Sequence, residues 1–159
     1  MSMDPCPEVR RPNGTLRAFV EARQLVPETI LPILDRAEAL AKGAPPVSVA
    51  PSSSATLLFQ QPSTRTYLSF AHAAGALGYH TADLRDMSTT SFEKGESLED
   101  GLRTIAELSE LIIVRQPDHD ALLEFVRSSA ALPQPPIVVN AGSGPSEHPT
   151  QSLIDVATL

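Results

Sequence analysis

The chain of 159 residues is long enough for one domain with its own hydrophobic core, and not comfortably for two. Hydrophobic residues make up 42% of it, as expected of a soluble globular protein. The formal net charge of −7 at pH 7 argues against general nucleic-acid binding, because no run rich in lysine or arginine offsets it. Any phosphate binding must therefore come from a local cluster of donors.

Cysteine usage and hydropathy exclude further classes of protein. Cys6 is the only cysteine, which leaves no disulfide framework and no thiolate metal cluster. Neither a signal peptide nor an apolar run long enough to cross a membrane is recognisable. We therefore expect a cytoplasmic protein with no membrane partner.

The first third of the chain is predicted to be scaffold. Residues 1–14 are rich in proline and charge and are expected to form a loose arm. The apolar residues within 16–26 suggest a first short helix, and Pro27 is well placed to begin a second over 28–42. Residues 45–54, dominated by Pro, Ser, Ala and Val, are predicted to be a linker into the first strand.

A candidate anion site lies between a predicted strand at 55–59 and a predicted helix at 64–77. Ser63 can cap this helix, leaving backbone N–H groups unpaired at the positive end of the helix dipole, where phosphate binds well. Arg65 adds a planar, permanently charged group, and the hydroxyls of Ser63 and two neighbouring threonines add further donors. The alternative is an ordinary capped helix with a surface arginine.

A polar loop follows the next predicted strand, which covers residues 79–84. Lys94 stands in this loop beside a glycine and close to a row of hydroxyls that includes Thr90 and Ser91. Such a lysine can swing over a bound anion and contribute charge without demanding fixed geometry. The alternative is a lysine that is merely solvated.

Arg115 is the next candidate binding residue. A helix over 97–109 is predicted to lead into a clearly buried strand at 111–114, which delivers Arg115 at its carboxyl end. Ligands gather at such ends in open α/β sheets. The alternative is a surface arginine at the end of a strand. The helix that follows, over 118–129, carries His119, which we expect to be exposed.

His148 is the histidine best placed for chemistry. A strand over 137–140 is predicted to end in a flexible turn at 141–144, and residues 145–151 open the final helix. A ring N–H of His148 at the mouth of the sheet can polarise a carbonyl and stabilise the oxyanion that forms when an amine attacks it. The alternative is an ordinary histidine at the start of a helix.

The alternation of strands and helices predicts an α/β fold. Parallel strands with right-handed crossovers give a three-layer sandwich, in which a central parallel sheet of about four strands is flanked by helices. Because the carboxyl ends of parallel strands share one edge, we expect residues 63–66, Arg115 and residues 148–151 to converge there. This convergence is the strongest argument for a site.

Three motifs in these segments resemble the aspartate and ornithine carbamoyltransferase family. Residues 59–66 (FQQPSTRT) look like its carbamoyl-phosphate signature, and HPTQ at 148–151 matches a family motif residue by residue. Residues 91–100 (SFEKGESLED) are similar to a mobile loop of the aspartate branch. The resemblance spans about residues 15–159 and implies the carbamoyl-phosphate-binding domain over that range.

The resemblance also implies a role for each candidate side chain. His148, Arg65 and Lys94 would be catalytic, with His148 on the carbamoyl oxygen. Lys94 and either Thr90 or Ser91 would reach into the active site of a neighbouring subunit, which implies a homotrimer. Carbamoyl phosphate would be bound by residues spread along the chain: Ser63, Thr64, Arg65, Thr66, Arg115, His148 and Gln151.

The implied reaction is attack by the α-amino group of L-aspartate on carbamoyl phosphate, giving N-carbamoyl-L-aspartate in pyrimidine biosynthesis, with no cofactor or metal. The resemblance also implies a second, aspartate-binding domain that is absent from this chain, and we expect the isolated domain to be inactive. Three positions depart from the family pattern: Gln61 replaces an acid, Gln116 a histidine and Ser143 a common aspartate. Two alternatives stay open, namely a catalytically silent binding or assembly paralogue, and transfer to another amine such as ornithine.

Overall fold

The computed structural model describes residues 16–85, 95 and 97–158. In this part of the chain one parallel sheet holds five strands: β1 (Ala18–Phe19), β2 (Ser54–Phe59), β3 (His80–Leu84), β4 (Leu111–Gln116) and β5 (Ile137–Ser143). The helices are α1 (Pro27–Ala41), α2 (Thr64–Leu77), α3 (Leu98–Leu108), α4 (His119–Ser129) and α5 (Pro149–Ala157), with a short 3-10 turn, η2 (Ala22–Gln24). None of the helices described is long and apolar enough to span a membrane.

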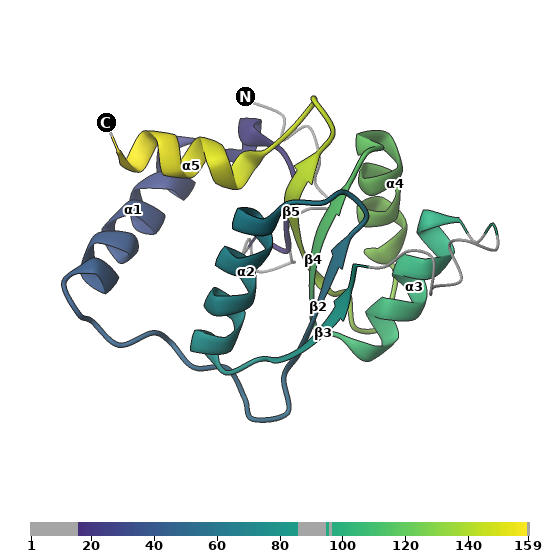
Figure 1. The fold of residues 1–159 in the computed structure, drawn as a ribbon, viewed down its shortest axis with the longest axis horizontal. Coiled ribbons are helices and arrows are strands. Elements are labelled where there is room, and N and C mark those ends of the chain that lie inside the picture. The colour runs from purple at the N-terminus through teal and green to yellow at the C-terminus, as the bar shows by residue number, and fades with distance from the viewer. Residues whose placement is uncertain (1–15, 86–94, 96, 159) are drawn as a thin grey trace.

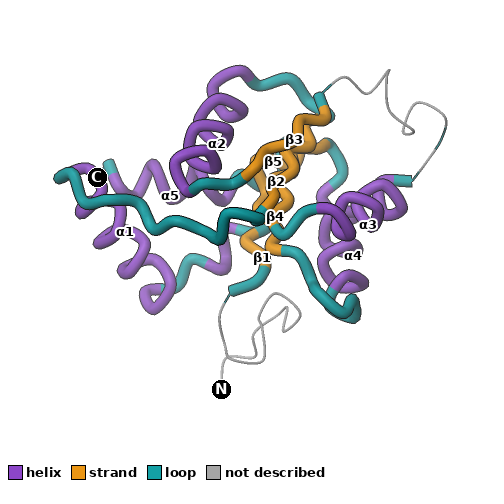
Figure 2. The backbone as a smooth tube through the Cα atoms, turned by 90° about the horizontal axis from the view of Figure 1, so that it is seen from below, coloured by secondary structure: helices purple, strands orange, loops and turns teal. Residues whose placement is uncertain are grey.

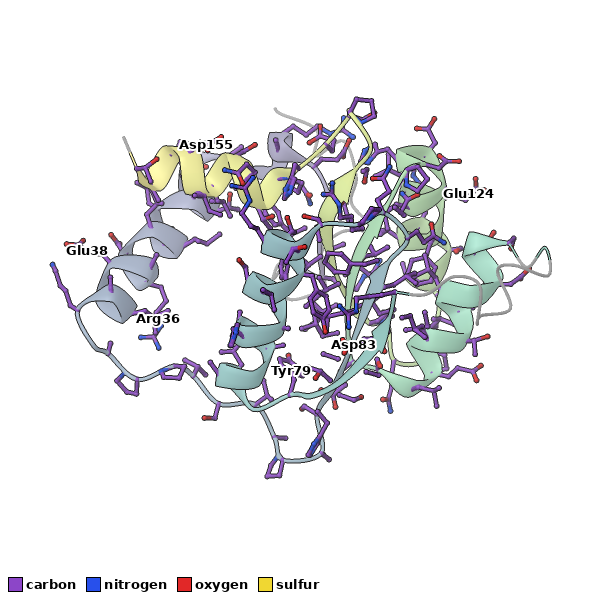
Figure 3. The ribbon with its side chains drawn as sticks, viewed as in Figure 1. Arg36, Glu38, Tyr79, Asp83, Glu124 and Asp155 are labelled. Atoms are coloured by element: carbon purple, nitrogen blue, oxygen red, sulfur yellow. The ribbon has the colours of Figure 1, made fainter. Side chains whose placement is uncertain are left out.

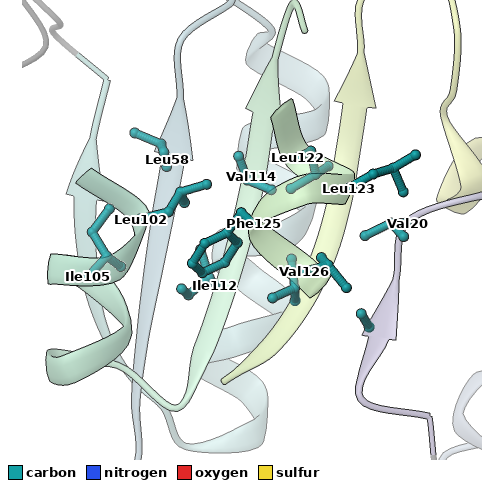
Figure 4. Close-up of a cluster of buried hydrophobic side chains, with 12 residues drawn as sticks. Val20, Leu58, Leu102, Ile105, Ile112, Val114, Leu122, Leu123, Phe125 and Val126 are labelled. Carbon is teal, nitrogen blue, oxygen red and sulfur yellow. The ribbon is translucent and has the colours of Figure 1, made fainter. Parts of the chain in front are cut away.

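The sheet is covered on both faces, which confirms the predicted three-layer α/β sandwich. Helices α3 and α4 lie on one face, and α2 and α5 lie on the other (Figures 1 and 2). Under α3 and α4, Phe125 and Ile112 belong to the larger cluster of buried apolar side chains (Figure 4). On the opposite face Leu57 and Ile113 pack against Tyr67 of α2.

The strand order β1-β5-β4-β2-β3 places a topological switch point between β2 and β4. From β2 the chain moves outward through α2 to β3, and it then returns past β2 through α3 to β4 (Figure 1). In open parallel sheets ligands bind at such a point, beyond the carboxyl ends of the strands. The loops that flank it here are the turns after Phe59 and after Gln116.

The fifth strand, β1, lies where a short helix is predicted over 16–26, and that local prediction is wrong. β1 pairs with β5 in parallel, and only the single turn η2 follows. Gln24 Oε1 accepts hydrogen bonds from the amides of Val20 (2.7 Å) and Glu21 (2.8 Å), while Gln24 Nε2 donates to the Ala18 carbonyl (2.8 Å). A side chain that takes up backbone groups in this way competes with helix formation.

Local capping contacts set the end of α2 and the starts of α3 and α4. Gly78 ends α2 with a φ of 89°, and the side chains of Ser97 and Asp118 accept hydrogen bonds from amides inside α3 and α4, both at 3.1 Å. Helix α1 lies on the side of α5, away from the sheet (Figure 1), and none of its residues is buried. Arg36 and Glu38, labelled in Figure 3, belong to this helix.

His119 is a second local correction, because it is largely buried where exposure is predicted. Its side chain is 13% exposed, and Nε2 lies 3.6 Å from Glu21 Oε1. Glu21 lies in the segment after β1, almost a hundred positions earlier in the chain. Helical periodicity cannot predict a contact between residues so far apart in sequence.

Candidate anion-binding site

Ser63 occupies the N-cap position of α2, as predicted, but its hydroxyl caps no amide. It donates instead to Thr66 Oγ1 at 2.9 Å. The first amides of α2 therefore have neither an intrahelical acceptor nor a side-chain cap, and they lie at the positive end of the helix dipole. Arg65 stands beside them with an exposed side chain that has no ion-pair partner in the described part of the chain.

The turn after β2 forms one wall of a pocket of about 340 Å³, and Gln61 is among its lining residues. On another side of this pocket the Arg85 guanidinium lies over the ring of Tyr67, 4.1 Å from its centroid. A hydrogen bond with Asp83 raises the pKa of Tyr67, so the phenol stays neutral. No motif predicts Tyr67 or Arg85 here. Tyr67 lies on α2 and Arg85 directly follows β3, and the two meet only because β3 pairs with β2 beside the start of α2.

Arg115 lies at the carboxyl end of β4, next to the turn after β2. Its carbonyl accepts a hydrogen bond from the Gln60 amide (2.8 Å), which joins the two loops across the switch point. Its Nη1 donates to the Ala141 carbonyl of β5 (2.9 Å), while its Nε is buried with no acceptor among the described residues. A buried guanidinium N–H without an acceptor is costly, and it can donate to an anion.

Gly142 makes room for Arg115 and His148 to lie together. A Cβ at this position would be 2.1 Å from Arg115 Nη1 and 3.3 Å from His148 Cδ2, and the φ of Gly142 is 124°. Only glycine satisfies both the space and the backbone conformation. The turn predicted over 141–144 is wrong, because β5 continues in extended form to Ser143.

His148 is the N-cap residue of α5. Burial and the nearby Arg115 guanidinium lower the pKa of His148, so its ring is neutral at pH 7. The Thr150 hydroxyl lies 3.3 Å from Nδ1. When the hydroxyl donates in this contact, the ring proton lies on Nε2, and Nε2–H is left for a further acceptor.

Three further residues of the family motifs are either hydrogen-bonded within the chain or buried: Gln151, Gln116 and Ser143. Gln151 Nε2 donates to Asp155 one turn along α5 (2.9 Å). Gln116 is fully buried, and both ends of its amide bind the backbone of Asp118, which closes the turn after β4. Ser143 is also fully buried, and its hydroxyl has no hydrogen-bond partner among the described residues. The structure thus brings Arg115 and His148 together, while Gln151 is exposed on α5.

Thr90, Ser91 and Lys94 lie outside the described residues, so their expected part in a neighbouring subunit's site stays a prediction. The same holds for the arm over 1–14. Across the described ranges, no group of three or more His, Cys, Asp or Glu side chains could hold a metal ion.

Comparison with known proteins identifies the family. Residues 17–159 match the model for the carbamoyl-phosphate-binding domain of aspartate/ornithine carbamoyltransferase. The aspartate carbamoyltransferase catalytic subunit of Methanocaldococcus jannaschii is 35% identical over 147 residues, which cover 91% of this chain and 46% of that protein. The corresponding subunit of Methanococcus maripaludis is 38% identical over 147 residues, covering 91% of this chain and 47% of its own length.

Solved structures agree in fold. The catalytic subunit of M. jannaschii aspartate transcarbamoylase matches with a TM-score of 0.75 at 33% identity, covering 90% of this chain and 46% of that one. Aspartate transcarbamoylase from Trypanosoma cruzi in complex with carbamoyl phosphate and aspartate gives a TM-score of 0.73 at 30% identity, covering 89% and 46%. This chain thus spans about half the length of the relatives it matches. By its sequence and its fold, the chain belongs to the aspartate/ornithine carbamoyltransferase family, where it corresponds to the carbamoyl-phosphate-binding domain.

Proposed function

We propose that this chain binds carbamoyl phosphate at the carboxyl edge of its sheet, and that the protein transfers the carbamoyl group to L-aspartate. One observation carries the proposal: Arg115 and His148 meet over Gly142, and the Gln60 amide joins Arg115 to the turn that leads into α2. The names of the relatives and the ligands of the T. cruzi complex support the same pair of substrates.

The start of α2 suits the phosphate end of the ligand. Its uncapped amides, the hydroxyls of residues 63, 64 and 66, and the Arg65 guanidinium all donate hydrogen bonds, and the helix dipole adds positive potential. The buried Nε of Arg115 adds a donor from β4. This local cluster of donors can hold a phosphate even though the net charge of the chain is −7.

His148 suits the carbamoyl end. Its neutral ring donates from Nε2 to the carbonyl oxygen, and this hydrogen bond strengthens as negative charge develops there. The amine lone pair forms the new C–N bond while the carbonyl π electrons move to oxygen. Collapse of this intermediate breaks the C–O bond to phosphate, which leaves with the bonding pair and takes up the proton that the nitrogen loses. Arg65 and Lys94 would stabilise the departing phosphate.

The remaining parts of the proposal concern groups outside one copy of the carbamoyl-phosphate-binding domain. We propose a second domain that recognises aspartate, and a homotrimer in which Lys94 and either Thr90 or Ser91 complete a neighbour's site. We place the product in pyrimidine biosynthesis in the cytoplasm. The support is the likeness to aspartate carbamoyltransferase catalytic subunits about twice as long as this chain.

A catalytically silent binding module is the second candidate function. It is favoured by Gln116, which replaces the family histidine, is fully buried, and already binds the backbone of Asp118 through both ends of its amide. Such a module would keep the phosphate cluster around α2 without completing the transfer.

Calorimetric titration with carbamoyl phosphate and with inorganic phosphate tests the binding site. Arg65→Ala should weaken both by about tenfold or more, because a hydrogen bond to a charged group contributes about 1.5–3 kcal/mol. Arg103→Ala is the matched control: this arginine of α3 pairs with Glu99 on its own helix, and its loss should leave binding unchanged. Absence of binding by the folded wild type, or equal binding by Arg65→Ala, would overturn the proposal.

A product assay separates the two candidate functions. The protein is supplied with carbamoyl phosphate and either L-aspartate or ornithine, and the carbamoylated amine is quantified. Carbamoyl aspartate supports the transferase, and binding without either product supports the silent module. Carbamoyl ornithine as the main product would refute aspartate as the acceptor.

A further inference from the structure

The side chains of Asn140 and Glu147 connect the candidate site to the edge of the sheet by hydrogen bonds. Residues 18–24, which contain β1 and η2, are called the edge segment below. Asn140 is fully buried on β5, and its Nδ2 donates to the Val20 carbonyl of the edge segment (2.9 Å). Glu147, in the turn after β5, accepts a hydrogen bond from the Ala22 amide through Oε2 (2.9 Å). Neither contact is a backbone pairing of the sheet.

Asn140 also orients one peptide group of the site. Its Oδ1 accepts from the Gly142 amide (2.8 Å). That amide and the Ala141 carbonyl belong to one planar peptide unit, and the carbonyl accepts from Arg115 Nη1 at 2.9 Å. Holding the N–H therefore holds the oxygen to which Arg115 is bound. Its two partners set the amide orientation of Asn140, because the flipped amide would face donor with donor and acceptor with acceptor.

Glu147 acts on the other half of the site. It directly precedes His148, and its carbonyl accepts from the Ser143 amide (2.8 Å), which closes the turn after β5. With its side chain on Ala22 and its carbonyl on Ser143, Glu147 is held at two points. His148 therefore leaves the turn in a fixed direction, which brings its ring against Gly142.

We propose that Asn140 and Glu147 are positioning residues: by binding backbone groups of the edge segment, they hold Arg115 and His148 in place relative to each other. The identity of the ligand rests on the proposed function above, whereas the geometry does not. Both residues act through the backbone and need not touch the ligand. A site whose supporting contacts are loose loses affinity even when every binding residue is present.

Three substitutions in the purified protein test these roles: Asn140→Ala, Glu147→Ala and Glu147→Gln. Affinity for inorganic phosphate is measured by calorimetry, and the His148 ring is titrated by NMR without ligand. Both alanine variants should bind phosphate about tenfold more weakly, as expected when a charged hydrogen bond is misplaced. The pKa of His148 should rise toward its ordinary value of about 6.5, because water reaches the ring and Arg115 moves. Glu147→Gln keeps an oxygen acceptor for Ala22 and should behave as wild type.

Thr56→Val separates positioning from general loosening of the fold. It removes another buried hydrogen bond, the 2.7 Å contact between Thr56 and Ser109, which lies away from the carboxyl end of β2. It should lower stability without changing phosphate affinity or the titration of His148. Equal changes in Thr56→Val, or unchanged affinity and titration in both alanine variants, would overturn the proposal.

One further measurement, together with the His148 titration, keeps the test decisive. If Asn140→Ala does not fold, exchange of the Gly142 amide in the wild type replaces it: slow exchange is expected from the bond to Asn140, and rapid exchange would overturn the role of Asn140. If the wild type binds no phosphate, the proposed function fails, and the His148 titration in the variants then decides the positioning roles alone.

Discussion

Gly142→Ala should perturb the candidate site directly. The new Cβ would lie 2.1 Å from Arg115 Nη1 and 3.1 Å from Arg115 Cζ, so the guanidinium must move. It would give up its hydrogen bond to the Ala141 carbonyl, and a hydrogen bond from a charged group contributes about 1.5–3 kcal/mol. Alanine at a φ of 124° adds backbone strain of about 1–3 kcal/mol.

We therefore expect Gly142→Ala to lower the free energy of unfolding by about 3 kcal/mol or more, out of about 5–15 kcal/mol for a typical domain. Phosphate affinity should fall about tenfold for each 1.4 kcal/mol of lost contact. Urea unfolding followed by circular dichroism measures the stability change, and calorimetric titration measures the affinity change.

Gly75→Ala is the matched control for this substitution. Gly75 lies inside α2, and a Cβ there would meet nothing within 4 Å. Helix propensity predicts a stabilisation of about 0.5–1 kcal/mol with unchanged phosphate affinity. Wild-type stability and affinity in Gly142→Ala, or identical behaviour of the two alanine variants, would refute the close approach of Arg115 to Gly142.

Three further predictions concern pH and the core. Because the pKa of His148 is lowered, the unfolded chain binds more protons than the folded chain near and below about pH 6.5, so stability falls on acidification; His148→Gln should remove this part of the pH dependence in urea unfolding. Arg17 is 2% exposed and donates to the Val126 carbonyl at 2.6 Å, so Arg17→Met should cost at least about 2 kcal/mol of unfolding free energy. Phe125→Ala should cost about 3–5 kcal/mol because it leaves a cavity under α4, whereas Leu31→Ala on exposed α1 should stay within about 0.5 kcal/mol.

Each of these has an outcome that contradicts it. A pH profile identical in wild type and His148→Gln would mean that His148 is not shielded by burial and Arg115. Wild-type stability in Arg17→Met would show that its buried hydrogen bonds contribute nothing net. Comparable losses in Phe125→Ala and Leu31→Ala would contradict the difference in burial between α4 and α1.

Local sequence signals determined helices α1 to α5 and strands β2 to β5, but not the segment over 16–26. A four-residue apolar run such as 111–114 is typical of a strand buried on both faces. Gly78 ends α2 and Ser97 begins α3 through hydrogen bonds to residues only a few positions away. The alternation of these elements also determined the α/β class, because parallel strands require crossovers.

Only the tertiary structure decided the edge of the sheet. β1 is two residues long and is stabilised by pairing with Val138 and Val139, about 120 positions later, so no local period reveals it. The burial of His119 beside Glu21 has the same origin, since the edge segment covers the start of α4. Contacts between distant segments override local propensity wherever they bury more groups than the local alternative.

The candidate site divides in the same way. Sequence alone predicted Arg65, Arg115 and His148 as candidates, because their chemistry, their positions after strands or at helix starts, and the family motifs around them can be read locally. It did not reveal that Gly142 must lack a side chain, nor that Asn140 and Glu147 bind the edge segment. Those requirements arise only when β5 lies between β4 and β1, because that neighbourhood sets the space and the hydrogen-bond partners available to each residue.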